Sequence, residues 1–498
     1  MNNRDLAPAP LRTRLMRKVV QGGDPLQVFL RLREEMGPSN VFLFESLAGP
    51  ANDRRSAVVG FGPLFEFVVH RSRIRLAGNE RLVAAAQTEL LATGLAVTSE
   101  DGMLLLEPGA LWSAARELQR LFAIPEQSAT EWDFGFVAVL GYDAIHYIED
   151  LRRQIPSETD AFADVTLRLY NGTVVFDLES ASATVLVANS EAWPDLDSAP
   201  LLAALAEPAF APMTIPSVPP PREVVDDTDE QQYTANVQRC LEHIAVGDIY
   251  QVQIGHELTV ISNVDELDVY LRLRARNPSP YMCLLPLSRW TAVGASPELF
   301  LRVEGDSAVM RPIAGTAPRS GDEDADARRV AELASDEKEC AEHVMLVDLC
   351  RNDLGKVSLA GTVDVHEMMA VENFSHVFHL VSEVSGRLTE SVDVFDVIQA
   401  AFPAGTMTGA PKIRSIEIIE DIERRRRGCY AGAFGLIGFG GYVNLGLAIR
   451  TLFRIDEDTW KLRASAGVVA DSKPAAEWRE TLAKMNAGYW AVTGDGLL

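Results

Sequence analysis

A proline-rich stretch near the middle of the chain limits what this sequence can fold into. From residue 191 to about residue 229 it reads EAWPDLDSAP and then PAFAPMTIPSVPPPREVVDDTDE, with three consecutive prolines from Pro219 to Pro221. Because proline has a fixed φ and no backbone N–H, this stretch cannot continue a helix or a sheet ladder. We therefore expect two domains, residues 1–215 and 228–498, which suits a chain of 498 residues.

The composition narrows the class of protein. With 47% hydrophobic residues the chain can bury a full core, yet no apolar run approaches the ~18 residues of a membrane span. The first residues, MNNRDLAPAPLRTRLMRK, lack the apolar segment of a secretory signal, so we expect a soluble, cytoplasmic protein without a membrane partner. The five cysteines are scattered and never spaced C-x-x-C, which indicates neither a disulfide framework nor a zinc site. A net charge of -25 argues against a nucleic-acid partner, because such binding depends on clustered Lys and Arg.

Strand patterns dominate the first half and mixed patterns the second. The run FEFVVHRSRIRL (65–76) is typical of strands, and TLRLYNGTVVFDL (166–178) predicts a hairpin that turns at Asn171-Gly172. Long helical patterns follow at about 325–355 and 474–490. Because strands and helices do not alternate regularly, we expect an α+β fold and not a doubly wound sheet.

The second half opens on a predicted helix and strand. A capping box of Thr228 and Gln231 is expected to begin the helix, and Gly247 to end it. The strand YQVQIG (250–255) follows, and its alternation puts Tyr250 on one face together with the apolar residues two and four positions later.

Two E-x-x-E steps are the strongest local signal. They pair Glu339 with Glu342, and Glu477 with Glu480. On a helix this spacing puts both carboxylates on one face, so two such helices could offer four oxygen ligands to one hard cation such as Mg²⁺. With 71 acidic residues, the same pattern is also common on a solvated helix face, and that alternative stays open.

Several other residues have two interpretations. Arg450 ends the near-apolar run NLGLAIRT, where it could form a structural salt bridge or hold a substrate carboxylate. His379 could be a satisfied core histidine. The run RRRR (424–427) suits the C-terminal end of a helix dipole.

Two motifs are missing from the sequence. The segment GTMTGAPK (405–412) lacks the Gly-Lys-Ser/Thr ending of a phosphate loop, so we expect no nucleotide. The cysteines form no G-x-C-x-G turn, so we expect no internal glutaminase.

Taken together, the motifs of the second half resemble those of the chorismate-utilising enzymes, and most closely component I of anthranilate synthase. The segments that carry the resemblance are PIAGT (312–316), EHVMLVDLCRNDLGKVS (342–358), FPAGTMTGAPKIRSIEIIE (402–420), YAGAFGLIGFGG (430–441), IRT (449–451) and the closing helix. In the first half the resemblance rests on LFES (43–46) and RRSAVVGFGP (54–63). It implies two large antiparallel β-sheets packed as a sandwich with outer helices, and an N-terminal segment woven into them.

The resemblance also implies a metal and a substrate. In the family, the counterparts of Glu342 and Glu480 hold Mg²⁺, those of Glu339 and Glu477 reach it through water, and the metal grips the ring carboxylate of chorismate. Further residues are implied to bind the substrate: Ala314, Gly315 and Thr316 in the PIAGT loop, Tyr430, Arg450, the turn Ala466-Gly467-Val468, and Lys484 near the metal.

The catalytic roles follow from the same resemblance. A nucleophile adds at ring C2 while the C4 hydroxyl departs, and Glu298 matches the general acid that protonates this poor leaving group. Thr406 is also expected to be a catalytic residue. Gln251 stands where relatives that use water carry a lysine base, which favours ammonia as the nucleophile. His379 matches the histidine linked to the loss of pyruvate.

The leading hypothesis is therefore the synthase subunit of anthranilate synthase, which turns chorismate and ammonia into anthranilate and pyruvate. A separate glutamine amidotransferase subunit, component II, is expected to supply the ammonia. The alternatives are a 2-amino-2-deoxyisochorismate synthase, an aminodeoxychorismate synthase of specialised metabolism, and a non-catalytic ligand-sensing paralogue. Ala314 disfavours an enzyme that aminates C4, because such relatives usually carry a nucleophilic lysine there.

Two loops resemble the halves of the family's tryptophan feedback site. They comprise Glu45 and Ser46 on one side and Asn277, Pro278, Ser279, Pro280, Tyr281 and Met282 on the other. Packing between the sheets is the alternative role for them. Phe44 replaces the leucine usual in this site, which weakens the expectation of inhibition by tryptophan. Three further departures from the family pattern, Ala317, Asn444 and Ala466, suggest a paralogue of specialised metabolism.

Overall fold

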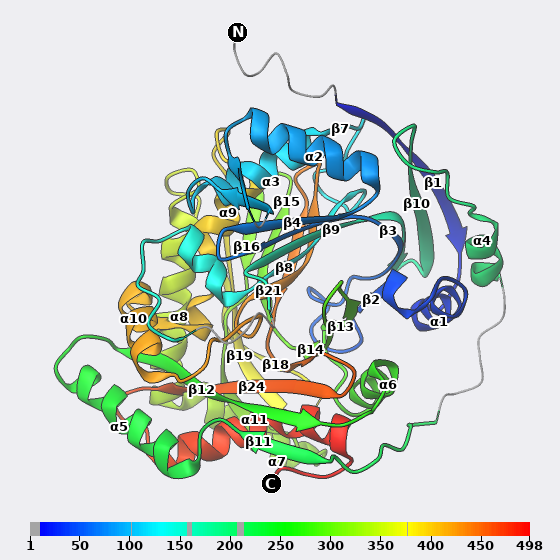
Figure 1. Ribbon diagram of the computed structural model, residues 1–498. Coiled ribbons are helices and arrows are strands. Elements are labelled where there is room, and N and C mark those ends of the chain that lie inside the picture. The colour runs from blue at the N-terminus through cyan, green and yellow to red at the C-terminus, as the bar shows by residue number, and fades with distance from the viewer. Residues whose placement is uncertain (1–9, 101, 157–161, 207–213, 376) are drawn as a thin grey trace.

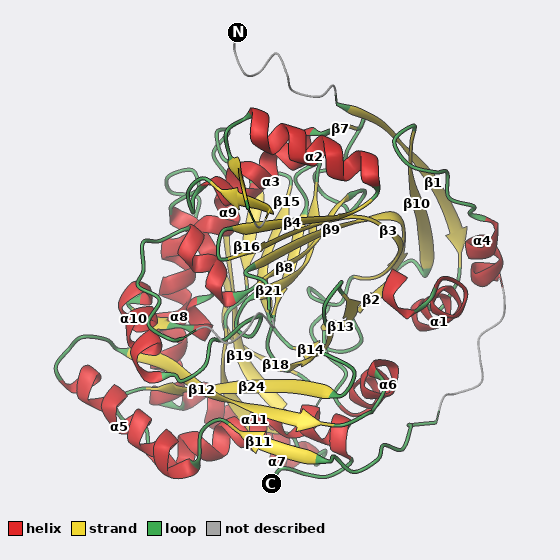
Figure 2. Cartoon of the chain, in the orientation of Figure 1, coloured by secondary structure: helices red, strands yellow, loops and turns green. Residues whose placement is uncertain are grey.

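The computed structural model describes residues 10–100, 102–156, 162–206, 214–375 and 377–498. Figure 1 follows the chain through these residues, and Figure 2 shows helices around the outside of the strands. The strands before the proline-rich stretch are β1 (Leu11–Gln21), β2 (Val41–Glu45), β3 (Ser56–His70), β4 (Arg73–Gly78), β5 (Ala96–Ser99), β6 (Gly102–Leu105), β7 (Phe122–Ala123), β8 (Gly135–Leu140), β9 (Val165–Asp177) and β10 (Ser182–Ser190). The helices there are α1 (Pro25–Met36), η2 (Pro38–Asn40), α2 (Glu80–Ala92), α3 (Ala110–Arg120), η3 (Tyr142–Tyr147) and α4 (Ala199–Ala206).

The second half adds longer helices and further strands. Its strands are β11 (Glu223–Asp226), β12 (Gln251–Ile261), β13 (Tyr281–Pro286), β14 (Thr291–Ser296), β15 (Leu299–Glu304), β16 (Ser307–Met310), β17 (Ile313–Pro318), β18 (Asp364–Asn373), β19 (Val377–Arg387), β20 (Gly409–Ala410), β21 (Ala433–Gly438), β22 (Val443–Leu447), β23 (Thr451–Arg454) and β24 (Thr459–Val468). Its helices are α5 (Glu230–Ala245), α6 (Glu266–Arg276), α7 (Glu323–Ser335), α8 (Glu337–Gly355), α9 (Val394–Ala401), η4 (Gly405–Met407), α10 (Lys412–Ile422) and α11 (Pro474–Thr493).

The strands form two antiparallel sheets that share the long strands β3 and β9. One sheet runs β1-β10-β9-β3-β2-β13-β14-β23-β24-β12-β11. The other runs β6-β4-β3-β9-β8-β21-β22-β15-β16-β19-β18, with β17 also on β19. The predicted α+β class is confirmed. Because β2 pairs with β13 and β8 with β21, strands from before the proline-rich stretch are built into both sheets.

The predicted hairpin at Asn171-Gly172 is wrong. β9 continues through both residues, and its register with β3 shifts between Pro63 and Phe65. β10 pairs with the C-terminal part of β9 and β8 with its N-terminal part, so this point is where the two sheets diverge. A Cβ on Gly172 would lie 2.2 Å from the Phe61 ring, so the glycine permits close contact between strands and does not mark a turn.

Three smaller expectations also need correction. Helix α5 begins after Asp229, whose side chain accepts a hydrogen bond from the backbone N–H of Gln232, and not after Thr228. The helical pattern at 325–355 forms two helices, because Asp336 ends α7 and caps α8. Tyr250 precedes β12 and is 73% exposed, so it does not share the buried face of Val252. None of the helices in the described part of the chain is both long and apolar enough to cross a membrane.

Candidate active site

Helices α8 and α11 bring the two E-x-x-E steps together. Burial, together with the charges of Glu339 and Glu480, raises the pKa of Glu342 to about 7. Burial also raises the pKa of Glu339 and of Glu477, again with a contribution from Glu480. Carboxylates that repel one another in this way suit a hard divalent cation. Among the described residues, no three of these four carboxyl groups bring oxygens within 4.8 Å of one another.

Gln251 lies beside this cluster at the start of β12 and is fully buried. Its Nε2 donates a hydrogen bond of 2.5 Å to Oε1 of Glu342. With the amide nitrogen directed at Glu342, Oε1 of Gln251 points away from that carboxyl. That oxygen has no hydrogen-bond partner. A Cβ on Gly467 would lie 2.9 Å from Nε2 of Gln251, so a side chain at that position would displace the amide.

Glu298 lies between β14 and β15 and is 6% exposed. Burial raises its pKa to about 8, although hydrogen bonds from the Thr406 hydroxyl and the Ile313 backbone, and the charge of Lys484, oppose the rise. The Thr406 Oγ1 to Glu298 Oε1 distance is 2.9 Å. Glu298 is therefore mainly protonated at pH 7 and can donate a proton.

His379 on β19 faces the loop of β17. Its Nδ1 lies 2.9 Å from the carbonyl oxygen of Gly315 and 3.1 Å from Oγ1 of Thr316. Since a carbonyl can only accept, Nδ1 carries the proton and Nε2 keeps its lone pair. Burial lowers the pKa of His379 to about 4, and the nearby charges of Arg450 and Lys484 lower it as well. The ring is therefore neutral at pH 7.

Two cationic side chains border the same region. Nη1 of Arg450 donates to the carbonyl oxygen of Lys484 at 3.1 Å, and burial lowers the pKa of the guanidinium. Within the described residues Arg450 forms no ion pair, so the expected alternative of a structural salt bridge does not hold there. Nζ of Lys484 donates to the Ser465 carbonyl oxygen at 2.9 Å and pairs with Glu480 at 2.7 Å. The Tyr430 hydroxyl donates a hydrogen bond of 3.0 Å to Oγ of Ser465.

The other predicted substrate residues lie on strands. Ala314 and Thr316 pair with β19, and Gly315 forms a bulge between them with φ +59°. The segment Ala466-Gly467-Val468 belongs to β24 and pairs with β12, so the expected turn there is wrong.

The two loops of the expected feedback site are neighbours. Met282 of β13 pairs with Glu45 of β2, and the Ser46 hydroxyl donates to the Pro280 carbonyl oxygen at 2.7 Å. Glu45 is already engaged, because Arg274 donates to both of its oxygens and the Tyr270 hydroxyl donates at 2.5 Å. A ligand ammonium at Glu45 would therefore compete with a bound guanidinium. Of the remaining wall residues, Asn277, Pro278 and Ser279 lie just before β13, and Tyr281 is its first residue.

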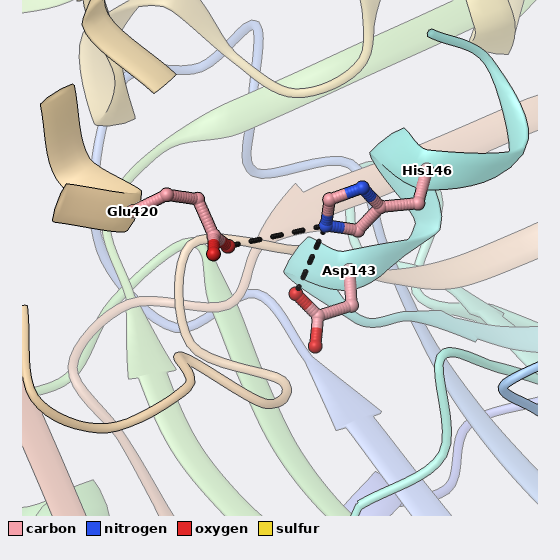
Figure 3. A group of neighbouring side chains, drawn as sticks. All are labelled: Asp143, His146 and Glu420. Carbon is pink, nitrogen blue, oxygen red and sulfur yellow. Dashed lines mark ion pairs between the residues drawn. The ribbon is translucent and has the colours of Figure 1, made fainter. Parts of the chain in front are cut away.

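A second cluster of titratable side chains lies away from this region. Nε2 of His146 is 3.9 Å from Oδ1 of Asp143 and 3.9 Å from Oε1 of Glu420 (Figure 3). Arg426 donates to these same two oxygens at 2.8 and 3.0 Å. A metal ion would have to share both oxygens with a guanidinium, so the cluster acts as a link between η3 and α10.

Sequence reasoning missed the buried partners of the run 424–427. The helix α10 ends at Ile422, so the four arginines lie beyond it and not at its dipole. Arg427 pairs with Glu423 and Arg426 with Asp143, both inside the protein. The available signal was the pair Glu420 and Glu423 just before the run, since a buried arginine requires an acidic partner.

Comparisons with known proteins identify the family of this chain. The model of the family described as chorismate binding enzyme matches residues 79–488. A 2-amino-4-deoxychorismate synthase from Streptomyces globisporus is 48% identical over 502 residues and covers 100% of both chains. Anthranilate synthase component 1 from Acinetobacter calcoaceticus is 34% identical, over 95% of this chain and 94% of that one. The crystal structure of anthranilate synthase component I from Streptococcus pneumoniae superposes with a TM-score of 0.71 at 28% identity, over 87% of this chain and 92% of that one. The chain therefore belongs to the chorismate binding enzyme family.

Proposed function

We propose that this chain aminates chorismate at ring C2 and releases 2-amino-4-deoxychorismate. This compound, also named 2-amino-2-deoxyisochorismate, keeps the enolpyruvyl ether at C3 and has no oxygen at C4. The observation that carries the proposal is the relative of that name, 48% identical over the whole of both chains, against 34% for an anthranilate synthase over a similar length. This was an alternative to the leading expectation, and it now takes precedence.

The residues of the site support attack at C2 by free ammonia. The loop of β17 presents Ala314, which has no nucleophilic atom, so this position supplies no amine that could capture the ring first. The unpaired Oε1 of Gln251 can accept one N–H of ammonia and leave the nitrogen lone pair free to attack. Ammonia needs no base to become nucleophilic, which suits a glutamine at this position.

The leaving hydroxyl needs a proton at the moment the C4–O bond breaks. Glu298, protonated near pH 7 and held by Thr406, supplies it, so that chorismate and ammonia give the aminated ring and water. Arg450 and Tyr430 face the enolpyruvyl carboxylate in this proposal. Mg²⁺ held by Glu342 and Glu480, with Glu339 and Glu477 around it, would neutralise the ring carboxylate.

A separate protein is proposed to supply the ammonia. The sequence has no G-x-C-x-G turn for glutamine hydrolysis, so glutamine can serve only through a glutamine amidotransferase partner. Purified alone, the chain should use ammonium salts at raised pH and not glutamine. Turnover of glutamine without a partner would exclude this part of the proposal.

Anthranilate synthesis is the second candidate, and one observation favours it. His379 is neutral, and its Nε2 lone pair is free to take the C2 proton while pyruvate leaves C3. A single reaction separates the two candidates. Chorismate, Mg²⁺ and ammonium chloride are incubated with the protein, anthranilate is followed by fluorescence, and pyruvate is followed by coupled lactate dehydrogenase.

We expect an amino product without an equal amount of pyruvate, and NMR should place the nitrogen at C2. Anthranilate with stoichiometric pyruvate would favour the second candidate. Nitrogen at C4 would contradict both.

A further inference from the structure

Three buried charged side chains lie behind the candidate site and take no part in the reaction proposed above. They are Glu423 and Arg427, which follow α10, and Arg463 on β24, and their side chains are 1–2% exposed. Nε and Nη2 of Arg427 donate to the two oxygens of Glu423 at 3.0 and 2.9 Å. Nη2 of Arg463 donates to Glu423 at 2.7 Å.

The network joins the elements that carry the proposed catalytic residues. Nη1 of Arg427 donates to the carbonyl oxygen of Met407 at 2.7 Å, and Nη2 donates to the carbonyl oxygen of Gln253 at 2.6 Å. Met407 follows Thr406 directly in the short turn η4. Glu423 also accepts a hydrogen bond of 3.0 Å from the backbone N–H of Gly255 on β12. The guanidinium of Arg427 thus bridges η4 and β12.

The balance of charge argues against a simple salt bridge. In the described part of the chain Glu423 is the acidic partner of both Arg427 and Arg463, which leaves one excess positive charge inside the protein. Burial alone would raise the pKa of Glu423, but the two guanidiniums outweigh it and lower the pKa. Burying an uncompensated charge is costly, and a hydrophobic side chain would usually serve stability as well.

We propose that Arg427 is a positioning residue that acts on the general acid through η4. By holding the Met407 carbonyl, it fixes the turn that bears Thr406, and Thr406 in turn aims Glu298 at the departing oxygen. The inference rests on the proposed function, because it requires Glu298 to act as the acid. Lysine in place of Arg427 would keep the charge but lose the planar fork that reaches Glu423, Met407 and β12 together.

The test is a double-mutant comparison on the full-length protein. The rate of chorismate consumption with ammonium chloride is measured for Arg427→Lys, for Thr406→Val and for the double variant. We expect Arg427→Lys to lower kcat about 10- to 100-fold, since small errors of position cost this much, with KM for chorismate changed less than about threefold. In the Thr406→Val background the same substitution should lower kcat no further.

A pH profile adds a readout that a purely structural role would not change. The alkaline limb of kcat reports Glu298, whose carboxylate is stabilised by Thr406, by the Ile313 backbone N–H and by Lys484. Loss of the Thr406 bond should move this limb to higher pH in both single variants. The matched control is Arg426→Lys, a neighbouring buried arginine that pairs with Asp143 and Glu420, and its profile should stay in place.

If Arg427→Lys does not fold by circular dichroism, Glu423→Gln takes its place, with the same expected non-additivity. Additive effects of the two substitutions, or an unmoved alkaline limb, would overturn the inference and leave the proposed function intact. A wild-type protein that consumes no chorismate would overturn the proposed function and the inference with it.

Discussion

The Thr406 hydroxyl donates a hydrogen bond of 2.9 Å to Oε1 of Glu298, and both side chains are buried. Two opposing effects act on this carboxyl. Burial disfavours its charged form and raises the pKa to about 8, while the hydroxyl stabilises the charged form and limits that rise. The result is an acid that is protonated at pH 7 and can still release its proton to a leaving hydroxide.

Replacement of Glu298 tests this acid directly. We expect Glu298→Gln to lower kcat by about 10²- to 10⁴-fold, because the leaving hydroxyl loses its proton donor. The Kd for chorismate, measured by calorimetry, should change little. In the wild type kcat should fall as the pH rises through about 8, since the carboxyl loses its proton there. As a control, Glu304→Gln changes a carboxyl that pairs with Arg55 outside the site and should leave kcat within about threefold. Equal activity in Glu298→Gln would rule out the assigned role.

Metal binding should depend on pH through Glu342. With no metal bound the pKa of this carboxyl is raised to about 7, so a proton and the cation compete for it. We expect the affinity for Mg²⁺, measured by calorimetry, to weaken about tenfold for each pH unit below 7 and to level off above it.

The acidic residues on α11 supply the variant for this site. Glu477→Gln should weaken Mg²⁺ binding, whereas Glu337→Gln, an exposed residue at the start of α8, should not. A constant Mg²⁺ affinity from pH 6 to 8 would argue against Glu342 as a ligand.

The free carbonyl oxygen of Gln251 should contribute to ammonia affinity. We expect Gln251→Met to raise KM for ammonia about tenfold, which corresponds to the loss of one hydrogen bond of about 1.4 kcal/mol. KM for chorismate serves as the internal control and should change far less. Initial rates at varied ammonium chloride and fixed pH give both constants. An unchanged KM for ammonia would place the nucleophile elsewhere.

Because Ala314 has no nucleophilic side-chain atom, it should leave ring C2 open to attack by ammonia. We expect Ala314→Lys to form a covalent adduct with chorismate, seen by intact-protein mass spectrometry as the mass of chorismate less one water. The adduct should need Glu298, so the double variant Ala314→Lys with Glu298→Gln is the control. If the single variant shows neither an adduct nor a changed product, the loop does not face C2.

Much of the fold was readable because local rules and tertiary packing agreed. The run of residues 65–76, typical of strands, forms the end of β3 and the start of β4, and the closing helical pattern forms α11. Where they disagreed, packing prevailed. Asn171-Gly172 has the sequence of a hairpin turn, but contact with Phe61 selected glycine for its missing side chain inside β9. Asp336 interrupts a continuous helical pattern because its side chain caps the helix that follows.

The sequence by itself determined the family and indicated the candidate reacting groups, because motifs such as PIAGT and the paired E-x-x-E steps are local in the chain. Their protonation states and orientations were decided by the tertiary structure. The Glu298 carboxyl has a raised pKa because the fold buries it next to Thr406, 108 positions away. The side-chain oxygen of Gln251 is left without a partner because the amide N–H donates its hydrogen bond to Glu342. Desolvation and hydrogen-bond direction depend on neighbours that are distant in sequence, and only the folded chain brings those neighbours together.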